Sequence, residues 1–283
     1  MVNVGKLTDG KSDRQGQLAI IAGNGRFPFL VLAAARDQGI EPLVFAIKEE
    51  ASPELDRSAQ TVHWLSLGEV TKFLGLLGAE RVERVLLAGQ VKHSQLFSSI
   101  PADGLATQAL TSVERRTTDA LIGVFVRMME ARGIEVVDST LFLKPMLAGA
   151  GTLTERGPDP SEIEDIAYGR EMAKQIAGLD IGQAVVVADR ACVAVEAMEG
   201  TDAAIERAAA LCNGRRLVVV KVSKPDQDMR FDVPVVGAKT IEVMRRANAT
   251  ALAVDAGKTL LFERERMIEE ADRAAIAIVG MSD

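Results

Sequence analysis

The densest group of side chains able to do chemistry lies in residues 224–234, directly after an apolar stretch. It contains Lys224, Asp228, Arg230 and Asp232, between two prolines that restrict the backbone. If the run is extended, the two aspartates and the arginine point to one side, because side chains alternate along a strand. We therefore predict two carboxylates that flank one guanidinium, which favours a functional site; the alternative is a solvated charged run.

A second polar group follows an apolar strand of the C-terminal half. Glu196 interrupts this strand, and an unpaired carboxylate at such a buried position is costly, which favours a functional role. Thr201 and Asp202 follow, at the start of an expected helix. Both are candidate site residues, although a capping hydroxyl and a carboxylate in the first turn explain them equally well.

The N-terminal half offers two turns that follow apolar strands. The first, at 23–25, lies between a strand and a helix, where backbone amides and the helix N-terminus attract phosphate; a plain tight turn is the alternative. The second follows the strand near 82–88, where open parallel sheets place their binding crevice. The candidate substrate-binding residues in these turns are Gly23, Asn24, Gly25, Gly89 and Gln90.

Alternating apolar runs and helical patterns predict the fold class: α/β, with two domains. In the first half we expect a parallel sheet from strands at 18–22, 42–47, 82–88 and 134–138 and helices at 29–38, 68–77 and 119–132. In the second half we expect a mixed sheet from strands at 184–187, 193–197, 217–222, 251–254 and 275–279 and helices at 161–177, 240–247 and 264–274 and from 202 onward.

The expected domain boundary lies near residue 145. Residues 1–16 form a polar leader that we expect to be disordered, 17–145 a Rossmann-like nucleotide-binding domain, and 146–283 a mixed α/β catalytic domain. The glycine- and proline-rich segment 144–160 is predicted to be both linker and lid.

Composition narrows the function classes. With 48% hydrophobic residues, 26% charged residues and a net charge of −7, the chain resembles a globular enzyme and has no basic cluster for nucleic acid. No apolar run predicts a secretory signal or a membrane span, so a cytoplasmic protein is expected. The 2 histidines and 2 cysteines are too few for a zinc site, so any metal must be held mainly by carboxylates. His93 is left out of the catalytic set.

The ordered motifs resemble a known family, the LpxI-type UDP-2,3-diacylglucosamine diphosphatases of Gram-negative bacteria. The similarity runs from about residue 18 to 279 and is most specific in the C-terminal half. It departs at Thr118, where the family tends to have an aspartate, and at Asn24, within a turn usually made of glycines. The matching motifs lie at 180–183, 194–202, 224–234 and 237–241.

The resemblance implies an activity: hydrolysis of UDP-2,3-diacylglucosamine to 2,3-diacylglucosamine 1-phosphate (lipid X) and UMP, a step of lipid A biosynthesis. It also implies that substrate binds between the two domains, that Asp232 is essential, and that water is directed at the sugar-linked phosphorus. Lys224 and Arg230 are then expected to face the phosphates, with Gln227 contacting substrate.

The resemblance further implies a divalent cation, Mg²⁺ or Mn²⁺. Magnesium prefers one or two carboxylates with phosphate oxygens and waters, so Asp232 with Asp228 or Asp202 is the expected protein share. A diacylated substrate implies transient contact with the inner face of the inner membrane. A homo-oligomer is also allowed.

Two other functions compete with this hypothesis. An NAD(P)-dependent oxidoreductase is suggested by the first strand-turn-helix, but Phe27-Pro28 stands where the dinucleotide fingerprint has its third glycine. A non-catalytic carrier of a nucleotide-lipid is the third hypothesis. A rise in melting temperature with NAD would favour the oxidoreductase, and a rise with UDP would favour the hydrolase or the carrier. Binding without turnover would favour the carrier.

Overall fold

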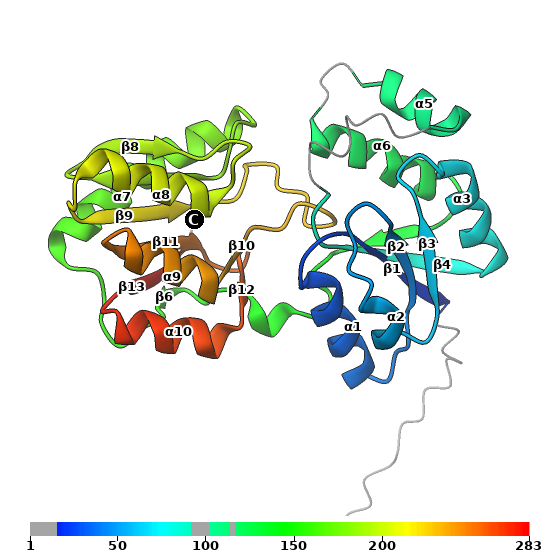
Figure 1. Cartoon of the computed structure of the whole chain (residues 1–283), viewed down its shortest axis with the longest axis horizontal. Helices are drawn as coiled ribbons and strands as arrows, with labels where there is room; N and C mark the ends of the chain where they lie inside the picture. Colours follow the sequence, from blue (N-terminus) through cyan, green and yellow to red (C-terminus); the bar gives the residue numbers. More distant parts are fainter. Residues whose placement is uncertain (1–15, 92–101, 114–116, 283) are drawn as a thin grey trace, which may run out of the picture.

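The computed structural model describes residues 16–91, 102–113 and 117–282. All of the predicted leader except Gly16 lies outside the described residues, and so does His93. The rest forms two α/β units, confirming the predicted fold class; in Figure 1 the first unit runs from blue to green and the second from green to red.

The N-terminal sheet is parallel throughout, as predicted, and most of its strands are apolar runs. Because the strand order reverses between β1 and β4, their carboxyl ends form the switch point where open α/β sheets bind ligands. In spatial order the strands are β3 (Val62–Leu65), β2 (Leu43–Ile47), β1 (Gln17–Ala22), β4 (Val82–Ala88) and β5 (Glu135–Val137).

Two groups of helices cover the two faces of this sheet. One face packs against α1 (Phe27–Asp37), α2 (Leu55–Ser58) and the 3₁₀ turn η1 (Lys144–Met146). The other packs against α3 (Val70–Ala79), α5 (Gly104–Thr111) and α6 (Thr118–Glu130).

The C-terminal sheet is mixed, also as predicted. Its central strands β13, β11 and β9 are parallel, whereas β6, β7 and β8 are antiparallel to their neighbours. In spatial order the strands are β6 (Gly151–Thr152), β13 (Ala277–Met281), β11 (Ala249–Asp255), β9 (Leu217–Lys221), β7 (Ala184–Ala188) and β8 (Ala191–Val195).

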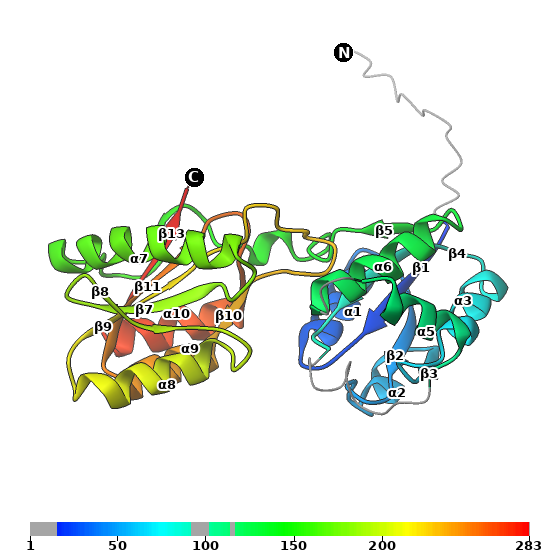
Figure 2. The ribbon, with the colours of Figure 1, turned by 90° about the horizontal axis from the view of Figure 1, so that it is seen from above.

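One long helix covers one face of this sheet and three helices cover the other (Figure 2). The single helix is α7 (Pro160–Gly178); the three are α8 (Thr201–Cys212), α9 (Ala238–Arg246) and α10 (Arg264–Arg273). A separate pair of parallel strands, β10 (Val235–Gly237) and β12 (Leu260–Phe262), lies beside them.

The loop between β9 and β10 joins the two units. It extends from the C-terminal sheet toward the N-terminal unit (Figure 1), where the buried Ser139 binds it. The Ser139 amide donates to the Met229 carbonyl at 2.9 Å, and its hydroxyl is 2.7 Å from the Arg230 carbonyl and 2.6 Å from that of Leu87. The segment richest in predicted site residues is therefore anchored on the neighbouring unit.

Two local expectations are wrong. The run from Asp228 to Asp232 is a turn, because the Phe231 and Asp232 amides donate to the Asp228 carbonyl at 3.2 and 2.9 Å. The two carboxylates therefore do not flank Arg230. The segment 144–160 is also no free lid: it contributes η1 and β6, and the Ala148 amide donates to the Thr259 carbonyl at 2.8 Å.

None of the helices in the described residues combines the length and the apolar character needed to cross a membrane.

Candidate functional site

A polar cleft with a cavity volume of about 520 Å³ is lined by residues of both units. On the N-terminal side it is formed by the loops after β1 and β4, at the switch point of the parallel sheet. The predicted site residues that line it are Asn24, Gly25, Gly89, Gln90, Glu196, Thr201, Lys224 and Asp232.

The loops after β1 and β4 are joined by their backbones. The Asn24 amide donates to the Gln90 carbonyl at 2.7 Å, and the Gln90 amide donates to the Asn24 carbonyl at 3.1 Å. A Cβ on Gly23 would lie 2.7 Å from the Gln90 carbonyl oxygen, and one on Gly89 would lie 2.6 Å from that of Asn24. These two glycines therefore permit the close approach of the loops, and the Asn24 and Gln90 amides are already used within the protein.

Two helix N-termini face the cleft. Helix α1 starts beside Gly25 and Arg26, and α8 starts at Gly200 and Thr201; all four residues line the cleft. Neither helix has a side-chain hydrogen bond at its N-cap. First-turn amides and the positive end of the helix dipole attract anions, so the cleft offers two sites for phosphate groups.

Lys224 lies among three carboxylates drawn from both units. Its Nζ is 2.7 Å from Asp180 Oδ1 and 3.2 Å from Asp232 Oδ2, and it also contacts Asp119 of α6. With three carboxylates around one ammonium group, the cluster carries excess negative charge.

The pKa values of this cluster reflect its burial and charge. Burial alone would lower the pKa of the Lys224 ammonium, but its hydrogen bonds to Asp119 and Asp180 outweigh that effect and raise the pKa. Burial, followed by repulsion from Asp232, raises the pKa of the Asp119 carboxyl against the opposing effect of Lys224. Lys224 is therefore a fixed cation, and Asp119 accepts a proton more readily than an ordinary aspartate.

Two glutamines fix Asp232. Gln183 Nε2 donates to its carboxylate at 3.1 Å, and Gln227 Nε2 donates to its backbone carbonyl. Gln227 Oε1 also accepts from the Lys224 amide at 2.7 Å. Both polar atoms of the Gln227 side chain therefore form hydrogen bonds within the loop that carries Lys224 and Asp232.

Glu196 and Thr201 belong to one hydrogen-bonded network. The Thr201 hydroxyl donates to Glu196 Oε1 at 2.6 Å and accepts from Lys221 Nζ at 2.9 Å. The Gln183 amide donates to Glu196 Oε2 at 3.2 Å, which satisfies the buried carboxylate. The network also holds the Lys221 ammonium at the cleft wall.

Three other predicted residues do not line the cleft: Asp228, Arg230 and Asp202. Arg230 pairs with Asp228 at 2.7 Å and with Glu130 at 2.6 Å. Asp202 accepts from the Thr240 hydroxyl at 3.0 Å and pairs with Lys239 at 3.3 Å. Within the described residues, no three His, Cys, Asp or Glu side chains form a group that holds a metal ion, so Asp232, Asp228 and Asp202 do not converge as a ligand set.

The prediction from residue types missed several participants. Asp119 was not among the candidate site residues, Asp180 and Gln183 fell only within the motif at 180–183, and Lys221 lay within an expected apolar strand. The break in hydrophobicity at Lys221, which ends β9, is a signal that could have identified it.

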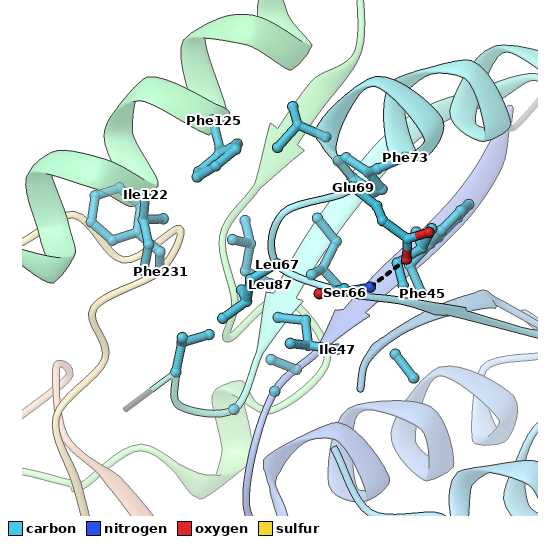
Figure 3. Close-up of a pocket in the computed structure, with 18 of the residues that line it drawn as sticks. Phe45, Ile47, Ser66, Leu67, Glu69, Phe73, Leu87, Ile122, Phe125 and Phe231 are labelled. Carbon is cyan, nitrogen blue, oxygen red and sulfur yellow. Dashed lines mark hydrogen bonds between the residues drawn. The ribbon is translucent and has the colours of Figure 1, made fainter. Parts of the chain in front are cut away.

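An apolar pocket adjoins the polar cleft and shares Gly89 and Phe231 with it. Figure 3 shows Phe231 extending from the loop that carries Asp232 toward Ile122 and Phe125 of α6. The cleft thus has a polar side and an apolar side.

Comparisons with known proteins agree in the family that they identify. The LpxI N-terminal domain matches residues 17–146, and the LpxI C-terminal domain matches residues 149–279. A protein of Caulobacter vibrioides named UDP-2,3-diacylglucosamine pyrophosphatase LpxI is 32% identical over 275 residues, 94% of this chain and 97% of that protein.

Similarity to solved structures is weaker. The biotin carboxylase domain of a thermophilic 2-oxoglutarate carboxylase gives a TM-score of 0.25 at 15% identity, over 61% of this chain and 35% of that one. The corresponding domain from Hydrogenobacter thermophilus gives 0.28 at 13% identity, over 71% and 42%.

Proposed function

Because the chain belongs to the LpxI family, we propose that it hydrolyses UDP-2,3-diacylglucosamine to 2,3-diacylglucosamine 1-phosphate and UMP. One observation of this chain supports the proposal most: a carboxylate cluster around Lys224 lies in a cleft that two uncapped helix N-termini face. Carboxylates suit water activation, while ammonium groups and helix N-termini suit the diphosphate.

The reaction requires water to attack one phosphorus of the diphosphate. We assign Asp232 to orient this water and accept its proton, since Gln183 and Lys224 hold the carboxylate from two sides. The new bond joins the water oxygen to the sugar-linked phosphorus, and the bond from that phosphorus to the bridging oxygen breaks. UMP leaves with the bridging oxygen.

The cationic groups of the cleft offset the charge that develops on the phosphoryl oxygens. Lys221 and Lys224 come from β9 and the loop that follows it, and Arg26 lies beside the start of α1. Fixed charges in a site that excludes water stabilise a transition state without reorganising, which is the main protein contribution to phosphoryl transfer. Arg230 acts indirectly, by holding Asp228 within the turn.

A divalent cation, Mg²⁺ or Mn²⁺, belongs to the same proposal, with a partner for Asp232 other than the Asp228 or Asp202 that the sequence suggests. Asp232 with Asp180 or Asp119 supplies one or two hard oxygen ligands, as magnesium prefers when phosphates complete its shell. When bound, the cation supplies Lewis-acid stabilisation of phosphoryl charge. Because the protein share is small, Mn²⁺ should bind weakly to the protein alone and at least about tenfold more tightly with UMP.

Access to a diacylated substrate suggests where the protein meets a membrane. Leu179 and Met198 are 66% and 73% exposed, and each lies within two residues of a cleft-lining residue, Ile181 or Ala197. We assign this apolar lip, Leu179 and Met198, to transient contact with the inner leaflet, from the cytoplasmic side.

One assay tests the proposed function directly. Purified protein is incubated with UDP-2,3-diacylglucosamine and Mg²⁺, with and without excess EDTA, and UMP and 2,3-diacylglucosamine 1-phosphate are measured. Formation of both products in equal amounts supports the hydrolase. Binding without turnover would instead favour a carrier, and full activity in EDTA would remove the cation from the proposal.

A further inference from the structure

The apolar pocket of the N-terminal unit has a lining unlike that of the polar cleft. It lies between the sheet and helices α3 and α6, and its walls include Phe45, Leu87, Ile122 and Phe125 (Figure 3). The Ser66 amide at its edge donates to Glu69 at 2.7 Å, so this group is already satisfied. A nucleobase needs polar partners for its edge, whereas a hydrocarbon does not.

The pocket has the size of a narrow apolar guest. Its cavity volume is about 120 Å³. An engineered apolar cavity of about 150 Å³ stays dry and binds benzene, so a space of this size can exclude water and take up hydrocarbon. The apolar lining suits a hydrocarbon chain better than a sugar, because sugar hydroxyls need hydrogen-bond partners.

Phe231 lies at the junction between the apolar pocket and the polar cleft, because it lines both. Its ring packs against the apolar cluster of the N-terminal unit, although its backbone belongs to the C-terminal loop. Asp232 follows it on the same turn, held to the Asp228 carbonyl at 2.9 Å. A guest that packs against the ring therefore contacts the turn that carries Asp232.

We propose that this apolar pocket binds one acyl chain of the substrate, and that Phe231 transmits the presence of the chain to Asp232. The proposal rests on the proposed function, which supplies a ligand with a diphosphate at one end and hydrocarbon at the other. Binding of the acyl chain in the pocket selects acylated over unacylated nucleotide sugars. Contact of the acyl chain with Phe231 holds the 228–232 turn in its reactive position.

The first test fills the pocket from two different walls, with Ile122→Trp and Leu67→Trp. The control is Met128→Trp, which lies on the same helix α6 and against the same apolar cluster but does not line the pocket. Substrates carry acyl chains of four to fourteen carbons. In the parent, kcat/KM should rise by up to about fourfold per buried methylene until the pocket is full.

The filled variants should lose this dependence on chain length, whereas the Met128→Trp control should keep it. Melting temperature and UMP binding check that each variant folds and retains the polar cleft. If either folded filled variant keeps the parent's dependence, the pocket is not the acyl site. If the parent hydrolyses none of the substrates, the proposed function fails, and calorimetric binding of the lipid product across the same series still tests the pocket.

The second test separates the pocket from its coupling to Asp232. Phe231→Ala should remove the rise of kcat with chain length while leaving a chain-length effect on KM. Phe262→Ala, which lines the polar cleft alone, should leave the rise of kcat intact. An unchanged rise of kcat in Phe231→Ala would overturn the role assigned to Phe231.

Discussion

Asp232 and Asp228 lie on one turn but have different surroundings, which makes them a matched pair for mutation. Asp232 faces the cleft beside Lys224, whereas Asp228 is paired with Arg230 at 2.7 Å. Asp232→Asn keeps the shape but removes the proton acceptor, so kcat should fall by about a hundredfold or more. Binding of the nucleotide-lipid should change little, since the phosphate contacts remain. Single-turnover kinetics and calorimetry measure the two effects separately.

Two controls accompany this variant. Asp226→Asn changes an exposed residue of the same loop and should leave kcat near the parent value. Asp228→Asn should lower the free energy of unfolding and have the smaller effect on kcat, because it removes the ion pair between Asp228 and Arg230. A parent-like kcat in Asp232→Asn, with normal folding, would exclude Asp232 as the group that activates water.

Asp119 should determine the acid side of the pH profile. Burial and the nearby charge of Asp232 raise the pKa of Asp119 above the value of an ordinary aspartate, about 3.9. On acidification, Asp119 therefore takes up a proton before an ordinary aspartate does. Protonation removes its ion pair with Lys224, and the parent's kcat should begin to fall at a higher pH than in Asp119→Asn. The pH dependence of kcat in both proteins, with Glu130→Gln as the control, measures this; coincident acid limbs would contradict the assignment.

At the residue scale, sequence reasoning identified the residue types of the site better than their partners. Lys224, Glu196, Thr201 and Asp232 do line one cleft. Arg230 was misplaced because alternation assumes an extended chain, and two hydrogen bonds to the Asp228 carbonyl bend the chain into a turn. The convergence of Asp119 with Asp180 depends on how two units meet, which local spacing does not encode.

Helix α7 illustrates how one element holds the C-terminal unit together. Its first turn contains the buried Glu162, which accepts from Arg156 at 2.8 Å and from Thr250 at 2.6 Å. Glu162→Gln keeps the volume but leaves Arg156 without its charged partner. Since the Arg156 side chain is 34% exposed, the free energy of unfolding should fall by about 2 kcal/mol, less than for a fully buried pair. Urea denaturation measures the change, and Glu164→Gln on the exposed side of α7 should be nearly neutral.

The same contact predicts a pH dependence of stability. Burial alone would raise the pKa of the Glu162 carboxyl, but the hydrogen bonds from Arg156, Thr250 and the Asp159 amide outweigh it and lower the pKa. The stabilisation is therefore complete above the unfolded pKa of about 4.3 and is lost as the pH falls through the lower folded value. The difference between parent and Glu162→Gln should be constant near pH 7 and should shrink below about pH 4.

The uncapped starts of α1 and α8 predict where the nucleotide protects the backbone. UDP should slow hydrogen exchange in the first turns of both helices, because a phosphate group at each helix start gives the first amides an acceptor. The Asn24 and Gln90 amides already have carbonyl partners, so their exchange should change less. Mass spectrometry of overlapping peptides resolves the two groups, and protection confined to α8 would remove the N-terminal unit from nucleotide binding.

At the element scale, strong hydrophobic periodicity was sufficient to predict a strand or helix where tertiary contacts agree with local preference. The apolar strands β1, β4 and β9 and the amphipathic helices were predicted close to their observed bounds. The sequence analysis missed β3, β10 and β12, each only three or four residues long, because short strands carry little pattern. Their pairing with β2, or with each other, defines them instead.

The two units meet through contacts that surround the cleft. Arg26 and Glu263 pair at 2.5 Å across the units, and Phe27 packs on Phe262 with ring centroids 5.6 Å apart. The loop that carries Lys224 and Asp232 crosses from one unit to the other. A site assembled in this way needs both units together, which explains why no single motif of the sequence describes it.

The membrane contact that we propose for the apolar lip, Leu179 and Met198, would orient the whole molecule toward a lipid surface. Leu179 and Met198 are exposed beside residues that line the polar cleft, so a lipid surface in contact with them would lie next to that cleft. Leu179→Ser with Met198→Ser removes apolar area that each residue can bury in the interface. Hydrolysis of substrate embedded in anionic vesicles should fall at least about fivefold, while hydrolysis of a short-chain, monomeric substrate should stay at the parent rate.

Leu211→Ser is the matched control for this orientation. Leu211 is also exposed, at 62%, but it lies near the C-terminal end of α8, whereas the cleft lies at the N-terminal end. At about 1.5 Å of rise per residue, the helix separates it from the cleft by roughly 15 Å. Its substitution should leave both rates unchanged. Equal losses on vesicles for the double variant and for Leu211→Ser would mean that general surface hydrophobicity, and not the lip, brings the protein to the membrane.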